Sequence, residues 1–155
     1  MTVYCIDTSS LIAAWQERYP IEVFPTLWEK IDALIEDRRL FSPIEVLNEM
    51  KKRSDELHAW LKDRKEMFLE LEDAVQIEAA HILAQFPRLV GERKLRTSAD
   101  SFVIALARVK GGQLVTDEKP TATLNRPNIP DVCTQLSMTT IDILSLIRAE
   151  RWVIG

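Results

Sequence analysis

The stretches Val3-Tyr4-Cys5-Ile6-Asp7 and Gln113-Leu114-Val115-Thr116-Asp117 decide the fold of this chain. Each is a continuous apolar run of the kind that forms a buried strand, and each ends in an aspartate. Such runs alternate with helical patterns, which predicts an α/β protein with a parallel sheet covered on both faces. Because catalytic groups collect at the carboxyl ends of parallel strands, we expect the two acids to share a site for a hard cation.

The composition narrows the class of protein. The chain has 155 residues, 46% of them hydrophobic, and a net charge of −4. This length suits one domain over residues 1–155. The negative charge gives nucleic acid no overall attraction, so contact with a polyanion would need a basic patch or bound cations. The sequence shows no disulfide framework, leader or apolar stretch of ~18 residues, which predicts a soluble, cytoplasmic protein without membrane contact.

Helical periodicity and breaker residues place the remaining elements. Ser42-Pro43-Ile44-Glu45 matches a capping box that would open one helix, and Gly111-Gly112 would close another. Other helices are expected over residues 26–38, 98–110, 132–136 and 140–148, with two more between 54 and 85. Short strands are expected at 40–41 and 138–139, and 152–154 is either a strand or a docked tail.

Two further acids can reach the same sheet edge. Glu49 lies on the helix that follows Ser42, and Asp100 lies in the first turn of a helix that is apolar on nearly every face. Each acid also has a simpler interpretation. Asp7 and Asp100 could cap helices, Glu49 could be a solvated charge, and Asp117 could be a turn residue. Their joint layout nevertheless favours a shared site.

Magnesium and manganese give such a layout a chemical purpose. Both ions take oxygen ligands and usually keep several waters beside a few carboxylates. Two like charges ~4 Å apart repel by about 4 kcal/mol at an effective dielectric near ~20, so a cluster without a cation would have raised carboxylate pKa values. A bound ion reconciles an acidic pocket with an anionic substrate and can activate water for attack on a phosphodiester.

At these residues the chain resembles the PIN-domain nucleases, and in particular the VapC-type toxins of toxin–antitoxin pairs. The matching segments are Ile6-Asp7-Thr8-Ser9-Ser10-Leu11-Ile12, Val46-Leu47-Asn48-Glu49, Ala99-Asp100-Ser101-Phe102-Val103-Ile104-Ala105-Leu106-Ala107 and Leu114-Val115-Thr116-Asp117. They follow one another in the family's order across residues 2–118. The later segment Ile129-Pro130-Asp131-Val132-Cys133 looks like a little-characterised PIN-like group.

The resemblance implies a three-layer α/β/α fold with a central, mainly parallel sheet. It also implies a metal-dependent endoribonuclease, the toxin of a toxin–antitoxin pair, with Mg²⁺ or Mn²⁺ as cofactor and RNA as substrate. Asp7, Glu49, Asp100 and Asp117 would be the catalytic residues and metal ligands. A cognate antitoxin and a second copy of the chain, in a homodimer, are the expected protein partners.

The resemblance also implies supporting residues and contains one departure. Thr8, Ser9 and Thr116 would supply hydroxyls that orient the acids. The common family pattern places the last acid two residues after the threonine, which is Glu118 in this chain. Either acid could fill that position, and we favour Asp117 because the shorter side chain directly follows the strand.

Two dense basic segments could hold an RNA backbone without reading its sequence. A plainer interpretation is that they are solvated helix ends and loop. Their residues are Lys51, Lys52, Arg53, Arg93, Lys94 and Arg96. His58 and His81 lack the neighbours of a zinc site. The four tryptophans are more simply core or subunit contacts than platforms for bases.

Two other functions compete with the ribonuclease. A non-catalytic PIN-like module could act through protein contacts or bind RNA without cutting it, and the departure at Glu118 motivates this alternative. A phosphatase with an aspartate nucleophile would normally need a second acid two residues after Asp7, where this chain has Ser9.

Overall fold

The fold is a central sheet between two layers of helices, as the sequence predicts. The computed structural model describes residues 1–53, 55–89 and 99–155. Its five strands are all parallel, in the order β3-β2-β1-β4-β5. The strands are β1 Tyr4–Ile6, β2 Leu40–Pro43, β3 Phe68–Leu69, β4 Gln113–Val115 and β5 Thr140–Ile141. The expectation of a three-layer α/β/α fold with a mainly parallel sheet is therefore confirmed.

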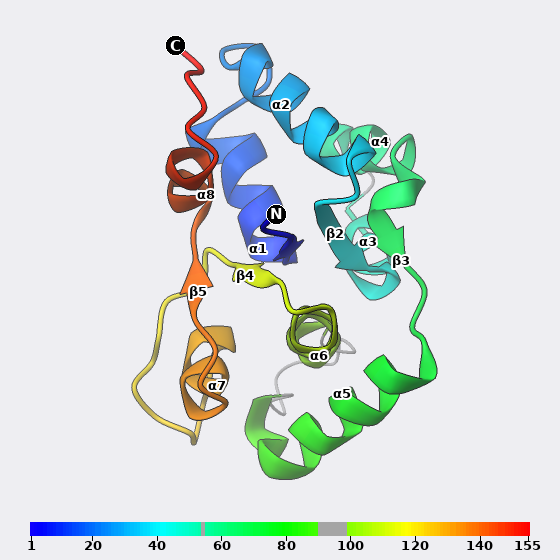
Figure 1. Ribbon diagram of the computed structural model, residues 1–155, viewed down its shortest axis with the longest axis vertical. Helices are drawn as coiled ribbons and strands as arrows, with labels where there is room; N and C mark the ends of the chain where they lie inside the picture. The colour runs from blue at the N-terminus through cyan, green and yellow to red at the C-terminus, as the bar shows by residue number, and fades with distance from the viewer. Residues whose placement is uncertain (54, 90–98) are drawn as a thin grey trace.

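The helices cover both faces of the sheet. Figure 1 shows α1, α2 and α8 on one face and α5, α6 and α7 on the other. Among the described residues, no helix is both long enough and apolar enough to cross a membrane. The α-helices are α1 Thr8–Ala13, α2 Pro25–Glu36, α3 Ile44–Lys51, α4 Glu56–Lys62, α5 Asp73–Gln85, α6 Asp100–Lys110, α7 Ile129–Gln135 and α8 Ile143–Ala149. A π-helical turn, Ala14–Arg18, extends α1, and 3₁₀ turns occupy Lys65–Met67 and Pro87–Leu89.

Strand β1 occupies the centre of the sheet and carries Asp7 at its end. Cys5 pairs in register with Phe41 of β2 and with Leu114 of β4. Its thiol is fully buried and lies 3.6 Å from the carbonyl oxygen of Val103 in α6, which fits the role of a small core residue. β1 is therefore paired on both sides and packed against α6.

The turn between α6 and β4 needs its glycines. Gly111 ends α6 with a φ of 66°, in the left-handed region that glycine adopts without strain. A Cβ on Gly112 would lie 3.3 Å from the carbonyl oxygen of Val3. This close approach lets β4 start directly beside β1, where Gln113 N donates to the same carbonyl.

Two local predictions differ from the structure, and one open alternative is decided by it. Strand β3 lies within the stretch that the sequence predicts to be helical, because a two-residue strand leaves no periodicity of its own. The last strand is Thr140–Ile141, two residues later than predicted, because Asp142 caps α8 through Ser145 N and the final helix starts only at Ile143. Residues 152–154 form no strand and are the docked tail.

The capping box at Ser42 is also wrong. Ser42 belongs to β2, and its hydroxyl donates to the carbonyl oxygen of Ile6 at 2.7 Å. Pro43 is the residue that precedes α3. The serine therefore ties the end of β2 to the end of β1, which brings α3 close to Asp7.

Three of the four tryptophans pack on one another, as core residues would. The ring centroids of Trp15, Trp28 and Trp60 lie 5.0 to 5.9 Å apart. The guanidinium of Arg64 covers the Trp60 ring at 3.6 Å and also binds Asp32. This stacking leaves Trp60 little free ring surface for a base.

Candidate metal centre at the carboxyl edge of the sheet

A pocket of about 350 Å³ lies at the carboxyl ends of β1 and β4. Its side chains come from Asp7 and α1, from α3 and the turn that follows it, from α6, and from the segment that follows β4. They are Asp7, Thr8, Ser9, Ile12, Glu49, Lys52, Arg53, Asp100 and Glu118. The pocket therefore gathers acids from segments far apart in the sequence, together with two cationic side chains.

Asp7 is the most buried of these acids. Its side chain caps α1 by accepting a hydrogen bond from Ser10 N at 2.8 Å. It also accepts hydrogen bonds from the hydroxyls of Ser9, at 2.9 and 3.0 Å, and Thr116, at 2.5 Å. With 2% of the residue exposed, Asp7 is both a helix cap and a pocket residue, so the two interpretations of this acid hold together.

The surroundings of Asp7 disfavour its charge. Burial raises the pKa of Asp7 to about 6, and the nearby charge of Asp100 adds to this effect. The hydrogen bonds from Thr116, Ser10 and Ser9 act in the opposite direction and only partly offset the burial. A cation in the pocket would favour the ionised form that burial opposes.

Glu49 and Asp100 reach the pocket from α3 and α6. Glu49 accepts a hydrogen bond from the Thr8 hydroxyl at 2.9 Å and another from Ala99 N at 2.9 Å. Glu49 is therefore fixed between α1 and the start of α6, which a merely solvated charge would not be. Asp100 is the first residue of α6, and its side chain lines the same pocket.

Of the two acids that follow β4, Glu118 lines the pocket and Asp117, which we favoured, does not. The guanidinium of Arg18 binds the carboxylate of Asp117 through both terminal nitrogens, and Asp117 does not line the pocket. Glu118 does line it, and its Oε1 accepts a hydrogen bond from Ile129 N at 3.0 Å. Successive residues of an extended chain point in opposite directions, so Thr116 and Glu118 lie on the side of Asp7 and the pocket, and Asp117 faces Arg18. The structure thus brings Glu118, and not Asp117, to the other three acids.

The three implied hydroxyls all contact this acidic group. Thr8 donates to Glu49, and Ser9 and Thr116 donate to Asp7. The Ser9 hydroxyl also accepts from Asp117 N at 3.0 Å, and the Thr116 hydroxyl accepts from Glu118 N at 3.1 Å. These contacts fix the backbone after β4 relative to α1.

The basic residues are only partly placed. Lys52 and Arg53 line the pocket beside Glu49. Arg53 also donates to Asp55 at 3.1 Å. Lys51 lies at the exposed end of α3. Arg93, Lys94 and Arg96 lie outside the described residues.

The chemistry of the donor set fits Mg²⁺ or Mn²⁺, because it consists of carboxylate and hydroxyl oxygens. The buried hydroxyls of Ser10 and Ser101, next in sequence to Ser9 and Asp100, have no hydrogen-bond partner. In the described part of the chain, however, no three histidine, cysteine, aspartate or glutamate side chains lie close enough together to hold a metal ion. Binding would therefore require some of the acids to turn toward the ion.

Sequence reasoning missed two contributors to this site. Arg18 lies at the end of the π-helical turn and carried no motif, although it decides where Asp117 points. The Ile129 amide, which holds Glu118, lies in a segment that stood out only for its resemblance. A backbone donor leaves no mark in the residue type, so no sequence signal could have identified it.

The fold and pocket define a three-layer α/β/α protein with an acidic, hydroxyl-lined pocket at the carboxyl edge of a parallel sheet. The chain belongs to the family described as a domain of unknown function (DUF4411), whose model matches residues 4–154. This match spans every residue of the pocket. No curated protein matches the chain.

Proposed function

We propose that this protein is an endoribonuclease that depends on Mg²⁺ or Mn²⁺ and hydrolyses RNA phosphodiester bonds. The observation that carries the proposal is the state of Asp7. It is a buried acid with a raised pKa, held by neutral donors, in a pocket shared with Glu49, Asp100 and Glu118. Acids with perturbed pKa values in a pocket are candidates for function, because catalytic sites often shift the pKa values of their acids by burial.

The two signs of charge in the pocket support an anionic substrate. Lys52 and Arg53 line the pocket from the turn that follows α3, so a phosphate at the mouth would meet cations on that side. The acids alone would repel a polyanion, and a bound cation removes that conflict. The resemblance to PIN-domain nucleases supports RNA as the polymer.

The chain's own residues have separate roles in this proposal. Asp7, Glu49, Asp100 and Glu118 would hold the ion, which when bound would supply an activated water and neutralise negative charge on the phosphate. Ser9 and Thr116 keep the Asp7 carboxylate in one orientation through their hydroxyls, and Thr8 does the same for Glu49. Below about pH 6, Asp7 holds a proton and is the weaker ligand.

The resemblance alone supports the finer parts of the proposal. On this basis we propose that the protein is the toxin of a toxin–antitoxin pair, with a cognate antitoxin as partner and a homodimer as the active form. For the fourth acid we expected Asp117, but Glu118 lines the pocket. We therefore assign the fourth position to Glu118.

Cleavage of an end-labelled single-stranded RNA tests the proposal. We expect cleavage with Mg²⁺ or Mn²⁺, products that carry 5′-phosphates, and no cleavage in excess chelator. Asp7→Asn should remain folded and lose the activity. The matched control is Glu45→Gln, which neutralises an acid on the same helix as Glu49 that does not line the pocket. Equal cleavage by Asp7→Asn, or in excess chelator, would refute the proposal.

A non-catalytic module that binds RNA or protein is the second candidate. Two observations favour it: the described residues contain no ready group of three metal ligands, and protein donors already bind Asp7 and Glu49. Calorimetry separates the candidates. A nuclease should bind Mn²⁺ at millimolar concentration or below, whereas a module without a working site should show no metal-dependent heat while it retains its RNA or protein partner.

A further inference from the structure

The segment Ile129-Pro130-Asp131-Val132-Cys133 begins α7, and the proposed chemistry gives it no role. Asp131 is its one charged residue and is 8% exposed. Its carboxylate accepts hydrogen bonds from the backbone N–H groups of Thr121, Ala122 and Asn128, at 2.8 to 3.0 Å, and from the Thr121 hydroxyl at 2.9 Å. Burial opposes the charge, but these hydrogen bonds lower the pKa of Asp131 below its ordinary value. An ionised side chain is therefore the hub of the loop that precedes α7.

A second contact closes the same loop at its base. The side-chain amide of Asn128 donates to the carbonyl oxygen of Lys119 at 2.8 Å. Asn128 and Asp131 also form a reciprocal capping box at the start of α7. The loop of residues 119–128 is thus closed at both ends. The Asn128 side chain binds Lys119 O, and Asp131 binds Asn128 N. The closed end lies next in sequence to Glu118.

The first residue of α7 binds Glu118 through its backbone amide. Ile129 N donates to Glu118 Oε1 at 3.0 Å. The N–H groups of a helix's first turn have no partner within the helix, so this one is available for a side chain. Ile129 is fully buried and is the first residue of α7, so the position of its N–H group follows the start of the helix. The position of Glu118 in the pocket therefore depends on where α7 begins.

We propose that Asp131 is a positioning residue whose carboxylate sets the start of α7 and, through the Ile129 amide, holds Glu118 at the acidic pocket. The inference rests on the proposed function only where it treats Glu118 as a metal ligand. The structural link stands without it: Asn128 N donates to Asp131, and the next residue's amide, Ile129 N, donates to Glu118. We call this arrangement of Asp131, Asn128 and Ile129, which holds Glu118, the clamp.

Replacement of Asp131 by asparagine tests the clamp. Asparagine keeps the size but turns one acceptor into an NH₂ donor, which cannot bind the N–H groups that now meet a carboxylate. The loop should loosen and move Ile129 N away from Glu118. Thr121→Val is the milder variant, because it removes one hydroxyl donor to Asp131 and leaves the carboxylate in place.

Hydrogen exchange of the Ile129 amide, measured by NMR without metal, reads the clamp directly. We expect exchange at least about tenfold faster in Asp131→Asn and in Glu118→Ala, and a smaller increase in Thr121→Val. The control is Asp142→Asn, which alters the aspartate that caps α8 and should leave Ile129 unchanged. Unchanged exchange in either Asp131→Asn or Glu118→Ala would overturn the inference.

The Mn²⁺ affinity, measured by calorimetry, tests the link to the site. Asp131→Asn and Glu118→Gln should each weaken binding about tenfold, and the double variant should be no weaker than Glu118→Gln alone, since both act on one ligand. Additive losses would mean a general structural effect of Asp131 and would overturn its role toward Glu118. If the unmodified protein bound no Mn²⁺, the proposed function would fail, while the exchange of Ile129 would still decide the clamp.

Discussion

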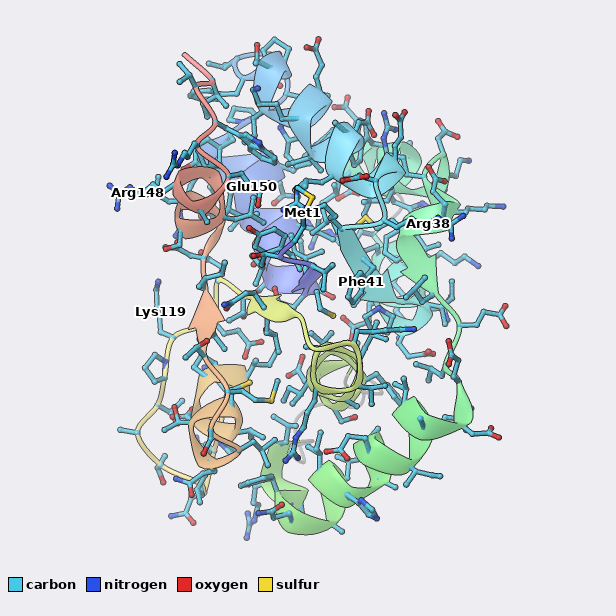
Figure 2. All side chains as sticks on the ribbon, in the orientation of Figure 1. Met1, Arg38, Phe41, Lys119, Arg148 and Glu150 are labelled. Carbon is cyan, nitrogen blue, oxygen red and sulfur yellow. The ribbon has the colours of Figure 1, made fainter. Side chains whose placement is uncertain are left out.

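Acids at the two edges of the central sheet have opposite kinds of hydrogen-bond donor. At the amino edge, Glu150 accepts a hydrogen bond from the Tyr4 hydroxyl at 2.5 Å and two from the Arg39 guanidinium, at 2.7 and 2.9 Å. Figure 2 shows Glu150 beside α8, on the side of the molecule that carries Met1. At the carboxyl edge, the hydrogen bonds to Asp7 come from two hydroxyls and an amide, which carry no net charge.

The pKa values follow this difference. Hydrogen bonds from Arg39 lower the pKa of Glu150, while burial, helped by Glu150, raises the pKa of Tyr4 to about 12. Burial raises the pKa of Asp7 to about 6. At the amino edge the Arg39 guanidinium neutralises the charge of Glu150. At the carboxyl edge the hydrogen bonds from Ser9, Ser10 and Thr116 do not neutralise the charge of an ionised Asp7. The first arrangement is that of a structural contact, and the second is consistent with the cation site that we propose.

The largest expected effect is the loss of cleavage in Asp7→Asn. Removal of its charge should lower metal-dependent RNA cleavage by about 10³-fold or more, the scale expected when a group that acts on the reacting phosphate is lost. Glu150→Gln, at the opposite edge, should leave the rate within about threefold. Single-turnover kinetics on a labelled RNA measures both. Similar losses in the two variants would break the comparison.

The pH dependence of folding should carry the mark of Asp7. The unfolded carboxyl titrates near its ordinary value and the folded one near pH 6, so the folded state binds more protons between the two. The stability contributed by this group is therefore complete below about pH 4 and is lost as the pH rises through 6, by roughly 3 kcal/mol. Urea unfolding across this range should show the loss in the unmodified protein and not in Asp7→Asn. Added Mg²⁺ should restore stability at pH 7 in the unmodified protein alone.

The neighbouring acids after β4 should differ in their effects. Glu118→Gln should lower cleavage by about 10²-fold, because it neutralises a pocket acid. Asp117→Asn should change it by less than about threefold, since Asp117 faces Arg18. The same RNA assay measures both variants. A reversed order would return the fourth position to Asp117.

Glu150→Gln should mainly affect stability. It leaves the guanidinium of Arg39 without its charged partner where both side chains are only 12 to 13% exposed. We expect a loss of about 2 kcal/mol in the free energy of unfolding, less than for a fully buried pair. Urea denaturation measures this loss. The corresponding Asp7→Asn change at pH 7 should be neutral or stabilising, and a loss of similar size there would contradict the comparison.

The smallest effect concerns Lys52 and Arg53. Replacing either by alanine should weaken RNA binding a few-fold, and removing one cation from the phosphates should reduce the slope of log K against log salt by about 0.7 for a single strand. Fluorescence anisotropy at several salt concentrations, with excess chelator to prevent cleavage, measures the slope. An unchanged slope would mean that Lys52 and Arg53 are solvated charges at the end of a helix and do not contact the RNA.

Much of the architecture was predictable because its signals are local. A window of about a dozen residues is enough to predict β1, β4 and the apolar helix α6 from their apolar residues. Their parallel arrangement then delivers Asp7 and Asp100 to one edge. Glu49 followed from its place on the helix after β2.

The features that sequence reasoning missed depend on distant partners. Asp117 is bound by Arg18, which is 99 residues away in the chain. Ser42 looked like a helix cap and instead binds Ile6, 36 residues away. Neither interaction changes the local pattern of residue types, so only the folded chain reveals it.

The order of the strands has a consequence for synthesis on the ribosome. The central strand β1 emerges early, but its neighbour β4, in which Gln113 pairs with Tyr4, emerges more than a hundred residues later. At translation rates of about 5–20 residues per second, Asp7 stays in contact with water for several seconds before β4 and Thr116 can enclose it. A nascent chain would therefore complete the acidic pocket only late in its synthesis.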